Sequence, residues 1–227
     1  MRMKNKIIFL MAFLTLFGYT AIAQPGQTEG VSFGLRGGIN FQNINGKDAD
    51  GDDLENEMVL RFNAGVVANI PVAPEFYFQP GLLYTTKGAK TDEFLNSSAE
   101  FTINYLEVPL SFLYKPLLGT GHLLLGFGPY IAYGLSGKTE ANVVGFEGER
   151  DIKFDNEYAG VLPYGEYFKR MDYGANLFFG YELENGLSLQ LNTQLGLAKI
   201  NAENTTNPDA DTSLKNTGFG ISLGYTF

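Results

Sequence analysis

The sequence predicts an all-β protein, an eight-stranded antiparallel up-and-down transmembrane β-barrel. Three observations lead to this fold class. Large apolar residues alternate with small or polar ones in eight separate stretches, and a period of two places the two sets on opposite faces of a β-strand. The connections between these stretches alternate long and short, as they do in barrels that cross a membrane. The chain also begins with the pattern of a secretory signal.

The first 30 residues are expected to direct export rather than to fold with the barrel. Residues 1–23 combine a basic start, an apolar run and small residues before Ala23, which is the organisation of a signal peptide cut after Ala23. An uncleaved anchor is the alternative, but an apolar run of about 16 residues is shorter than the roughly 20 that a spanning helix needs. Residues 24–30 then form a short periplasmic segment, and 31–227 form the barrel domain.

The composition fits an exported protein and argues against several partners. Cleavage after Ala23 removes three positive charges, so the formal net charge changes from −9 to −12. So acidic a protein is a poor match for nucleic acid or anionic lipid. The chain has no cysteine, which excludes disulfides and a lipid-anchored amino terminus.

Four strands are expected in the first half of the chain, at residues 31–41, 60–70, 76–87 and 105–114. In the first, the large apolar face is Val31, Phe33, Leu35, Ile39 and Phe41, and the opposite face is Ser32, Gly34, Arg36, Gly38 and Asn40. In the third, Lys87 shares the small or polar face with Gln79, Gly81 and Thr85. Pro80 counts against that strand, because proline cannot donate to a β-ladder. The connections 42–58 and 88–99 are long and polar, whereas 71–75 is short.

Four more strands are expected at 123–136, 172–182, 187–197 and 216–227. The connection 137–170 is the longest, charged and aromatic, and we expect extensions of its two flanking strands above the membrane. A tight turn at 184–186 and a polar loop at 199–215 complete the alternation of lengths. The closing strand places Phe219, Ile221, Leu223, Tyr225 and Phe227 on one face and only small or polar residues on the other. An aromatic-rich strand that ends on Phe227 is typical of outer-membrane barrels, and we expect Tyr225 and Phe227 to form the assembly signal that the barrel-assembly machinery reads.

A soluble lipocalin-like barrel is the alternative to a membrane barrel. It disagrees with the polar faces of the strands, which lack the charges of a surface that faces water. In lipid, every backbone group must pair within a closed barrel. We therefore expect the apolar faces to contact outer-membrane lipid, the long loops to lie outside the cell and both termini to lie in the periplasm.

Several longer motifs resemble those of a known family. They are FQPGLLYTTKGAK at 78–90, NYLEVPLSFLYK at 104–115, GFGPYIAYGLSGK from Gly126, and Asp172-Tyr173-Gly174. Together they are similar to the PorT-like, porin-family outer-membrane β-barrel proteins over residues 31–227. The resemblance implies an outer-membrane barrel, and some PorT proteins take part in a system that secretes proteins across the outer membrane.

Charged residues on the inward faces are the first candidate site. They are Arg36, Arg61, Glu107, Asp172 and Glu182. The interior of an eight-stranded barrel is just wide enough for side chains to fill it, and buried charges are costly unless they pair. We expect a lumenal charge network in which Arg36 and Arg61 neutralise the carboxylates and plug the barrel. The alternative is an ion-selective pore lined by the same groups.

An acidic loop is the second candidate site. It contains Asp48, Asp50, Asp52, Asp53 and Glu55 around Gly51. Oxygen ligands at alternate positions suit calcium, although the spacing differs from that of an EF-hand loop. A solvated acidic loop is the favoured reading, because runs of acidic residues usually face water.

The sequence does not predict an enzyme. Its only histidine, His122, falls in a predicted periplasmic turn, far from the outer rim where barrel enzymes use histidine as acid or base. No cofactor motif is present. We expect a non-enzymatic barrel with a structural or surface-interaction role and a filled lumen. A narrow channel for ions or small solutes, and an accessory role in secretion, are the alternatives; the extracellular partner is not predicted.

Overall fold

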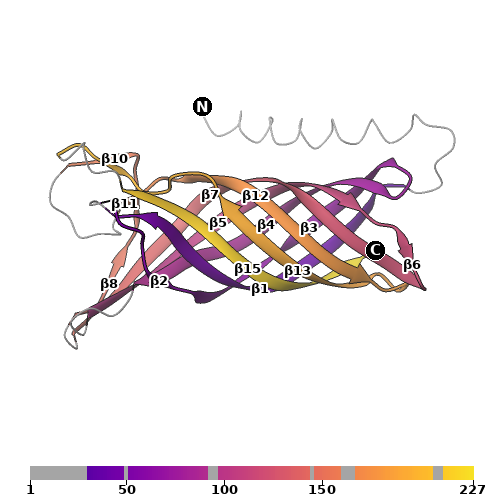
Figure 1. Cartoon of the computed structure of the whole chain (residues 1–227), viewed down its shortest axis with the longest axis horizontal. Coiled ribbons are helices and arrows are strands. Elements are labelled where there is room, and N and C mark those ends of the chain that lie inside the picture. Colours follow the sequence, from indigo (N-terminus) through magenta and orange to yellow (C-terminus); the bar gives the residue numbers. More distant parts are fainter. Residues whose placement is uncertain (1–29, 49–50, 92–96, 144–145, 160–166, 207–211) are drawn as a thin grey trace, which may run out of the picture.

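A computed structural model describes residues 30–48, 51–91, 97–143, 146–159, 167–206 and 212–227 of the chain. Eight long strands form one closed antiparallel ring, so the predicted fold class is confirmed (Figure 1). They are β1 (Ser32–Lys47), β3 (Val59–Ala73), β4 (Phe76–Thr91), β5 (Ser97–Tyr114), β7 (Gly121–Val143), β12 (Met171–Glu182), β13 (Leu187–Gly196) and β15 (Ser213–Thr226). Each pairs with the next, and β1 closes the ring on β15.

The short strands gather at one end of the barrel, with one exception. They are β2 (Asn56–Glu57), β8 (Phe146–Asp151), β9 (Lys153–Phe154), β10 (Glu157–Tyr158), β11 (Tyr167–Phe168) and β14 (Glu203–Asn204), whereas β6 (Leu117–Leu118) lies at the opposite end. The long connections therefore share one end of the ring, which we call the loop end. The tight turns lie at the other end, together with the start of β1 and the end of β15 (Figure 1).

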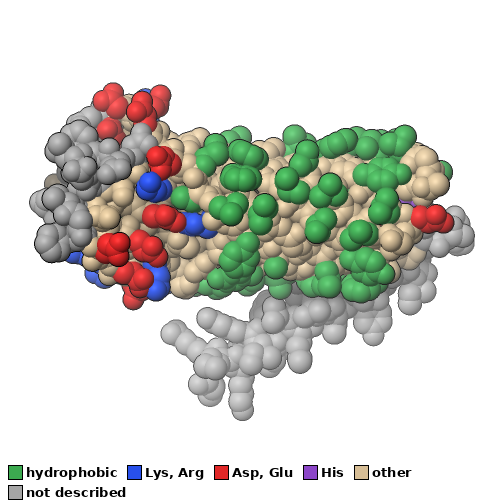
Figure 2. Space-filling model, turned by 90° about the horizontal axis from the view of Figure 1, so that it is seen from below, with side chains coloured by type: hydrophobic (Ala, Val, Ile, Leu, Met, Phe, Trp, Pro, Cys, Tyr) green, Lys and Arg blue, Asp and Glu red, His purple; other side chains and the backbone are tan. Residues whose placement is uncertain are grey.

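The outer wall of the barrel carries the large apolar residues that the alternation predicts. Leu191, in the middle of β13, is 54% exposed and lies opposite Ile221 on β15 and Phe179 on β12, which are also exposed. Figure 2 shows apolar side chains covering the wall as a broad belt, with charged side chains gathered beyond it at the loop end. A belt this wide would be unfavourable in water. No helix among the described residues is long and apolar enough to cross a membrane.

The wall rises above the belt at the loop end, but not in the way that the sequence led us to expect. Of the two strands that flank 137–170, only β7 is extended, to Val143, where it forms a hairpin with β8. The other flanking strand, β12, begins at Met171. The chain before it is bonded sideways instead: β11 pairs in parallel with β9, and Lys169 N donates to Ile200 O at 2.7 Å.

Pro80 does lie inside a strand of the wall. The ladder between β3 and β4 is interrupted at this residue: Val67 pairs with Gly81 and Ile70 pairs with Phe78, but Pro80 has no partner on β3. Proline has no N–H to donate, so the ladder loses hydrogen bonds at this position. The belt is continuous around it, because Phe78 and Leu82 keep their outward direction by alternation.

Candidate functional site

The lumen is filled by side chains, and small residues on the wall make the room for them. Gly126 on β7 is the clearest case: a Cβ at this position would lie 2.0 Å from the Phe178 ring of β12. Only glycine therefore lets Phe178 lie across the interior. Inward-facing polar side chains are almost fully buried around it, as expected for a barrel of eight strands.

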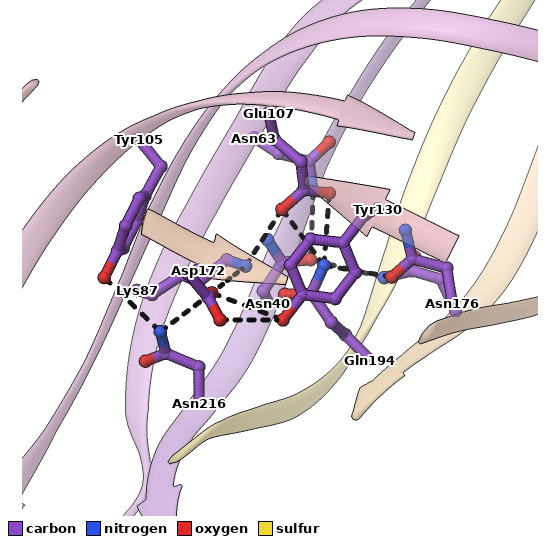
Figure 3. A network of polar contacts seen from close by, with 11 residues as sticks. Asn40, Asn63, Lys87, Tyr105, Glu107, Tyr130, Asp172, Asn176, Gln194 and Asn216 are labelled. Carbon is purple, nitrogen blue, oxygen red and sulfur yellow. Dashed lines mark hydrogen bonds and ion pairs between the residues drawn. The ribbon is translucent and has the colours of Figure 1, made fainter. Parts of the chain in front are cut away.

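A fully buried lysine lies at the centre of the main polar network (Figure 3). Lys87 Nζ of β4 is 2.9 Å from Glu107 Oε2 of β5 and 3.0 Å from Asp172 Oδ2 of β12. The exposed side-chain fractions of the three are 0%, 4% and 0%. Two carboxylates thus share one ammonium group that is buried from bulk water.

Neighbouring side chains complete the coordination of this charged centre, which we call the Lys87 network. Asn216 Nδ2 of β15 donates to Asp172 at 3.0 Å, and the Tyr130 hydroxyl of β7 donates to the same carboxylate at 3.2 Å. Gln194 Nε2 of β13 donates to both oxygens of Glu107. The ammonium also lies 4.1 Å from the centre of the Tyr130 ring, a favourable cation–π distance. Six strands therefore meet in one network.

An apolar cluster closes the lumen on the loop side of the Lys87 network. It consists of Ile44, Ala89, Phe101, Ile103, Ala132, Ile152, Phe168, Ala198, Ile200 and Leu214, and its inner side is formed by Tyr105 and Tyr130. We call this cluster the apolar cap. Ile152, Phe168 and Ile200 come from the long connections, and each is at most 6% exposed. The Phe168 ring packs edge-on to Phe101, with 6.0 Å between centroids.

A second polar layer lies nearer the turn end. Arg36 of β1 donates from Nη2 to Gln79 Oε1 at 2.7 Å, and its guanidinium lies 5.0 Å from the centre of the Phe178 ring. Below it, Lys115 Nζ is 2.6 Å from Glu182 Oε1. The lumen is therefore crossed by several layers in turn: the apolar cap, the Lys87 network, the Arg36 layer and the Lys115–Glu182 pair.

The structure corrects the partners that we assigned to the predicted charged residues. Glu107 and Asp172 come together as expected, but Lys87 lies between them and neither arginine does. Arg61 lies at the loop end, 2.8 Å from Glu100 of β5. Arg36 binds the neutral Gln79. Glu182 belongs to the turn end with Lys115, which the sequence reasoning did not consider as a partner.

The acidic loop does not form a cluster of carboxylates in the part of the chain that the structure describes. Asp48 Oδ1 accepts a hydrogen bond from Asp52 N at 3.0 Å and so stabilises a turn, and the backbone of Asp53 forms an isolated antiparallel β-bridge with that of Lys47. Within the described ranges no three His, Cys, Asp or Glu side chains, Glu55 included, converge on a point where they could hold a metal ion. Asp50 lies outside these ranges, as does Ala23.

Exposed ion pairs lie at the loop end of the barrel, whereas His122 lies at the turn end. The hydrogen bond from Lys138 to Glu149 raises the pKa of Lys138, and the hydrogen bond from Lys169 lowers the pKa of Glu203. His122 is the second residue of β7 and pairs in register with Glu182 at the turn end. The histidine therefore lies at the opposite end of the barrel from the loop end, which is the end where barrel enzymes use a histidine as acid or base.

A closed eight-stranded ring with an apolar outer belt and a filled lumen defines an integral membrane β-barrel. The family model described as "Outer membrane protein beta-barrel domain" matches residues 22–202. The chain belongs to this family, and the protein is an integral outer-membrane β-barrel protein.

The similarity of this chain to individual known proteins is low. None of the curated proteins matches this chain. Several solved structures are similar to it, among them the following three. Ail, the attachment invasion locus protein of Yersinia pestis, is 12% identical, with 86% of this chain and 98% of that chain covered and a TM-score of 0.41. Neisserial surface protein A is 10% identical, with 88% and 100% covered and a TM-score of 0.45. OprG from Pseudomonas aeruginosa is 14% identical, with 86% and 95% covered and a TM-score of 0.40. Identities this low do not transfer a function.

Proposed function

We propose that this protein is a non-enzymatic barrel with a lumen closed to solutes, and that it acts through the structure it displays at the loop end. The observation that carries the proposal is the pairing of the apolar cap with the Lys87 network. A solute path would have to displace buried side chains such as Phe168 and Ile200 from apolar contact. It would then have to separate Lys87 from two carboxylates at 2.9 and 3.0 Å.

The topology and the export route form part of the same proposal. Residues 1–23 are a signal peptide cut after Ala23, 24–30 are periplasmic, and the loop end faces the outside of the cell. The hairpin of β7 and β8 above the belt supports this orientation, because it carries exposed charges such as Lys138 of β7 and Glu149 of β8 beyond the apolar wall. The role is structural or a surface interaction, with a partner of unknown identity.

Planar bilayer recordings test the closed lumen. We expect purified, heat-modifiable full-length protein to insert without steady conductance, because the lumen is filled at every layer described above. A steady, reproducible conductance from protein shown to be folded by its gel migration would overturn the proposal and favour the narrow channel.

We also propose that the strand with Tyr225 and Phe227 is read by the barrel-assembly machinery. Phe227 is 73% exposed and its ring packs edge-on against Tyr225 at 5.3 Å, so its contribution to the folded wall is small. Phe227→Ala should nevertheless lower the amount of assembled protein several-fold in outer-membrane fractions. Leu189→Ala, which removes another outward-facing side chain of 52% exposure, is the matched control. Equal levels of the two variants would show that Phe227 is only a lipid-facing residue.

The finer resemblance to the PorT-like proteins supports a second proposal, an accessory role in protein secretion. Its basis is the set of motifs at 78–90, 104–115 and from Gly126. Deletion of the gene followed by a comparison of secreted proteins tests it, and an unchanged set of secreted proteins would contradict it.

A further inference from the structure

A cavity lies in the middle of the lumen, between the Lys87 network and the Arg36 layer. Its volume is about 50 Å³. Glu107 and Gln194 of the Lys87 network form one side, and Arg36 and Phe178 form the other. Seven of the eight barrel strands contribute to its wall, so the cavity is central and does not lie at a seam.

Buried polar atoms without a protein partner are concentrated around this cavity. Gln42 Oε1, Asn63 Oδ1 and Arg36 Nε are buried and make no hydrogen bond to any described group, and all three residues line the cavity. Gln42 is only 3% exposed, so bulk water does not compensate for the missing partner of its Oε1. Leaving such groups unpaired is unfavourable, because each loses its hydration on folding without a replacement.

We propose that the cavity binds a cluster of water molecules as a permanent part of the barrel interior. At roughly 10–15 Å³ for each water, the volume takes about three to five molecules. Buried waters usually form about three hydrogen bonds to polar groups that would otherwise be unsatisfied, and the cavity offers such groups on β1 and β3. Asn40, Asn176 and Asn192 add further amides to its wall.

The mixture of donors and acceptors selects water over an ion. A cation would satisfy the oxygens of Gln42 and Asn63 but would meet the guanidinium of Arg36. An anion would satisfy Arg36 Nε but would meet the carboxylate of Glu107 and the same two oxygens. Water both donates and accepts, so it alone suits all four groups. An empty cavity is not expected either, because cavities that stay dry have apolar walls.

The cluster is separated from bulk water on both sides. On the loop side, the Lys87 network and the apolar cap lie above the cavity. On the turn side, Arg36 also lines a smaller cavity of about 10 Å³. Phe178 lies 5.0 Å from the Arg36 guanidinium and packs with Leu113 and Leu124, which line that smaller cavity, so Arg36 and Phe178 lie between the two spaces. The waters should therefore exchange slowly, and the proposal holds whether or not the loop end binds a partner.

Nuclear magnetic resonance of the full-length protein in lipid nanodiscs tests the proposal directly. Side-chain amide protons of Gln42 and Asn63 should show cross-relaxation with water, with the sign of long-lived bound molecules. Asn185, exposed in the turn before β13, shows that water contacts are detected under the same conditions. Contacts at Asn185 but at neither Gln42 nor Asn63 would overturn the proposal.

The substitution Gln42→Met gives a second readout whose direction decides the question. Methionine keeps the length of the side chain and removes its polar end. If water binds the amide, the folding equilibrium constant should fall about tenfold, as for loss of a typical hydrogen bond. If the cavity is dry, the same change removes an unpaired buried amide, and the constant should rise. Heat-modifiable gel migration confirms that the variant is assembled.

Salt exchange separates water from an ion. At constant ionic strength, replacing sodium by potassium or chloride by fluoride should shift the urea midpoint equally in the native protein and in Gln42→Met. A dependence on one ion that Gln42→Met abolishes would assign the cavity to that ion and overturn the proposal.

Discussion

Replacing Lys87 with methionine is expected to destabilise the barrel by about 3–5 kcal/mol, the cost of breaking a buried ion pair from one side. The variant leaves Glu107 and Asp172 buried, close together and without a cation, because Lys87 is the ammonium group that both carboxylates contact. Equilibrium urea unfolding in lipid vesicles measures the loss. It should appear as a lower midpoint with an unchanged slope.

The loss of stability in Lys87→Met comes from the two buried carboxylates that no longer have a cation beside them. Removing their charge should therefore reverse the loss. The triple variant Lys87→Met, Glu107→Gln, Asp172→Asn should recover most of the lost stability, because a buried ion network replaced by neutral side chains of similar volume is often no less stable. Lys138→Met, which removes a half-exposed ion pair with Glu149, is the matched control and should leave the unfolding free energy unchanged. A small loss in Lys87→Met, no greater than in Lys138→Met, would mean that bulk water reaches the network and weakens its ion pairs.

Leu191→Arg is expected to destabilise the barrel by about 2–4 kcal/mol, the cost of arginine on the lipid face at the middle of a bilayer. Leu191 is outward-facing near the centre of β13. Leu197→Arg, at the loop-end edge of the belt and 55% exposed, should cost only about 0–1 kcal/mol, because arginine near the interface reaches water. Unfolding in vesicles gives both values.

The comparison tests the membrane placement, since the two leucines are almost equally exposed. On a wall that faced water, both substitutions would be close to neutral, within about 0.5 kcal/mol. Equal and small effects of Leu191→Arg and Leu197→Arg would therefore contradict the lipid-facing belt. A large effect at Leu191 alone would support it.

The faces of the strands could be predicted from the sequence, because alternation needs no knowledge of the register. Glu107, Asp172 and Lys87 all point inward as their positions indicate. Their pairing could not be predicted. Lys87 and Asp172 are 85 residues apart and lie on β4 and β12, which are not neighbours in the ring. Contacts across a lumen depend on the tilt and stagger of all the strands.

The apolar cap was beyond sequence reasoning for a different reason. Ile152 and Ile200 lie in irregular segments, where there is no period from which to predict a direction. Apolar residues within a long, charged connection indicate that the connection packs against other parts of the protein. They do not indicate which parts. Strand ends were equally hard to place: β7 extends to Val143, seven residues beyond the expected end, since β8 provides a partner above the membrane.

The shared ammonium of Lys87 should also constrain how this family diverges. Because one lysine serves Glu107 and Asp172 on two other strands, loss of any one charge by mutation is harmful until another follows. Related barrels should therefore keep all three ionisable residues or replace them together. Substitution histories at these positions should be correlated across distant parts of the chain, while Lys138 and Glu149 should drift independently of each other.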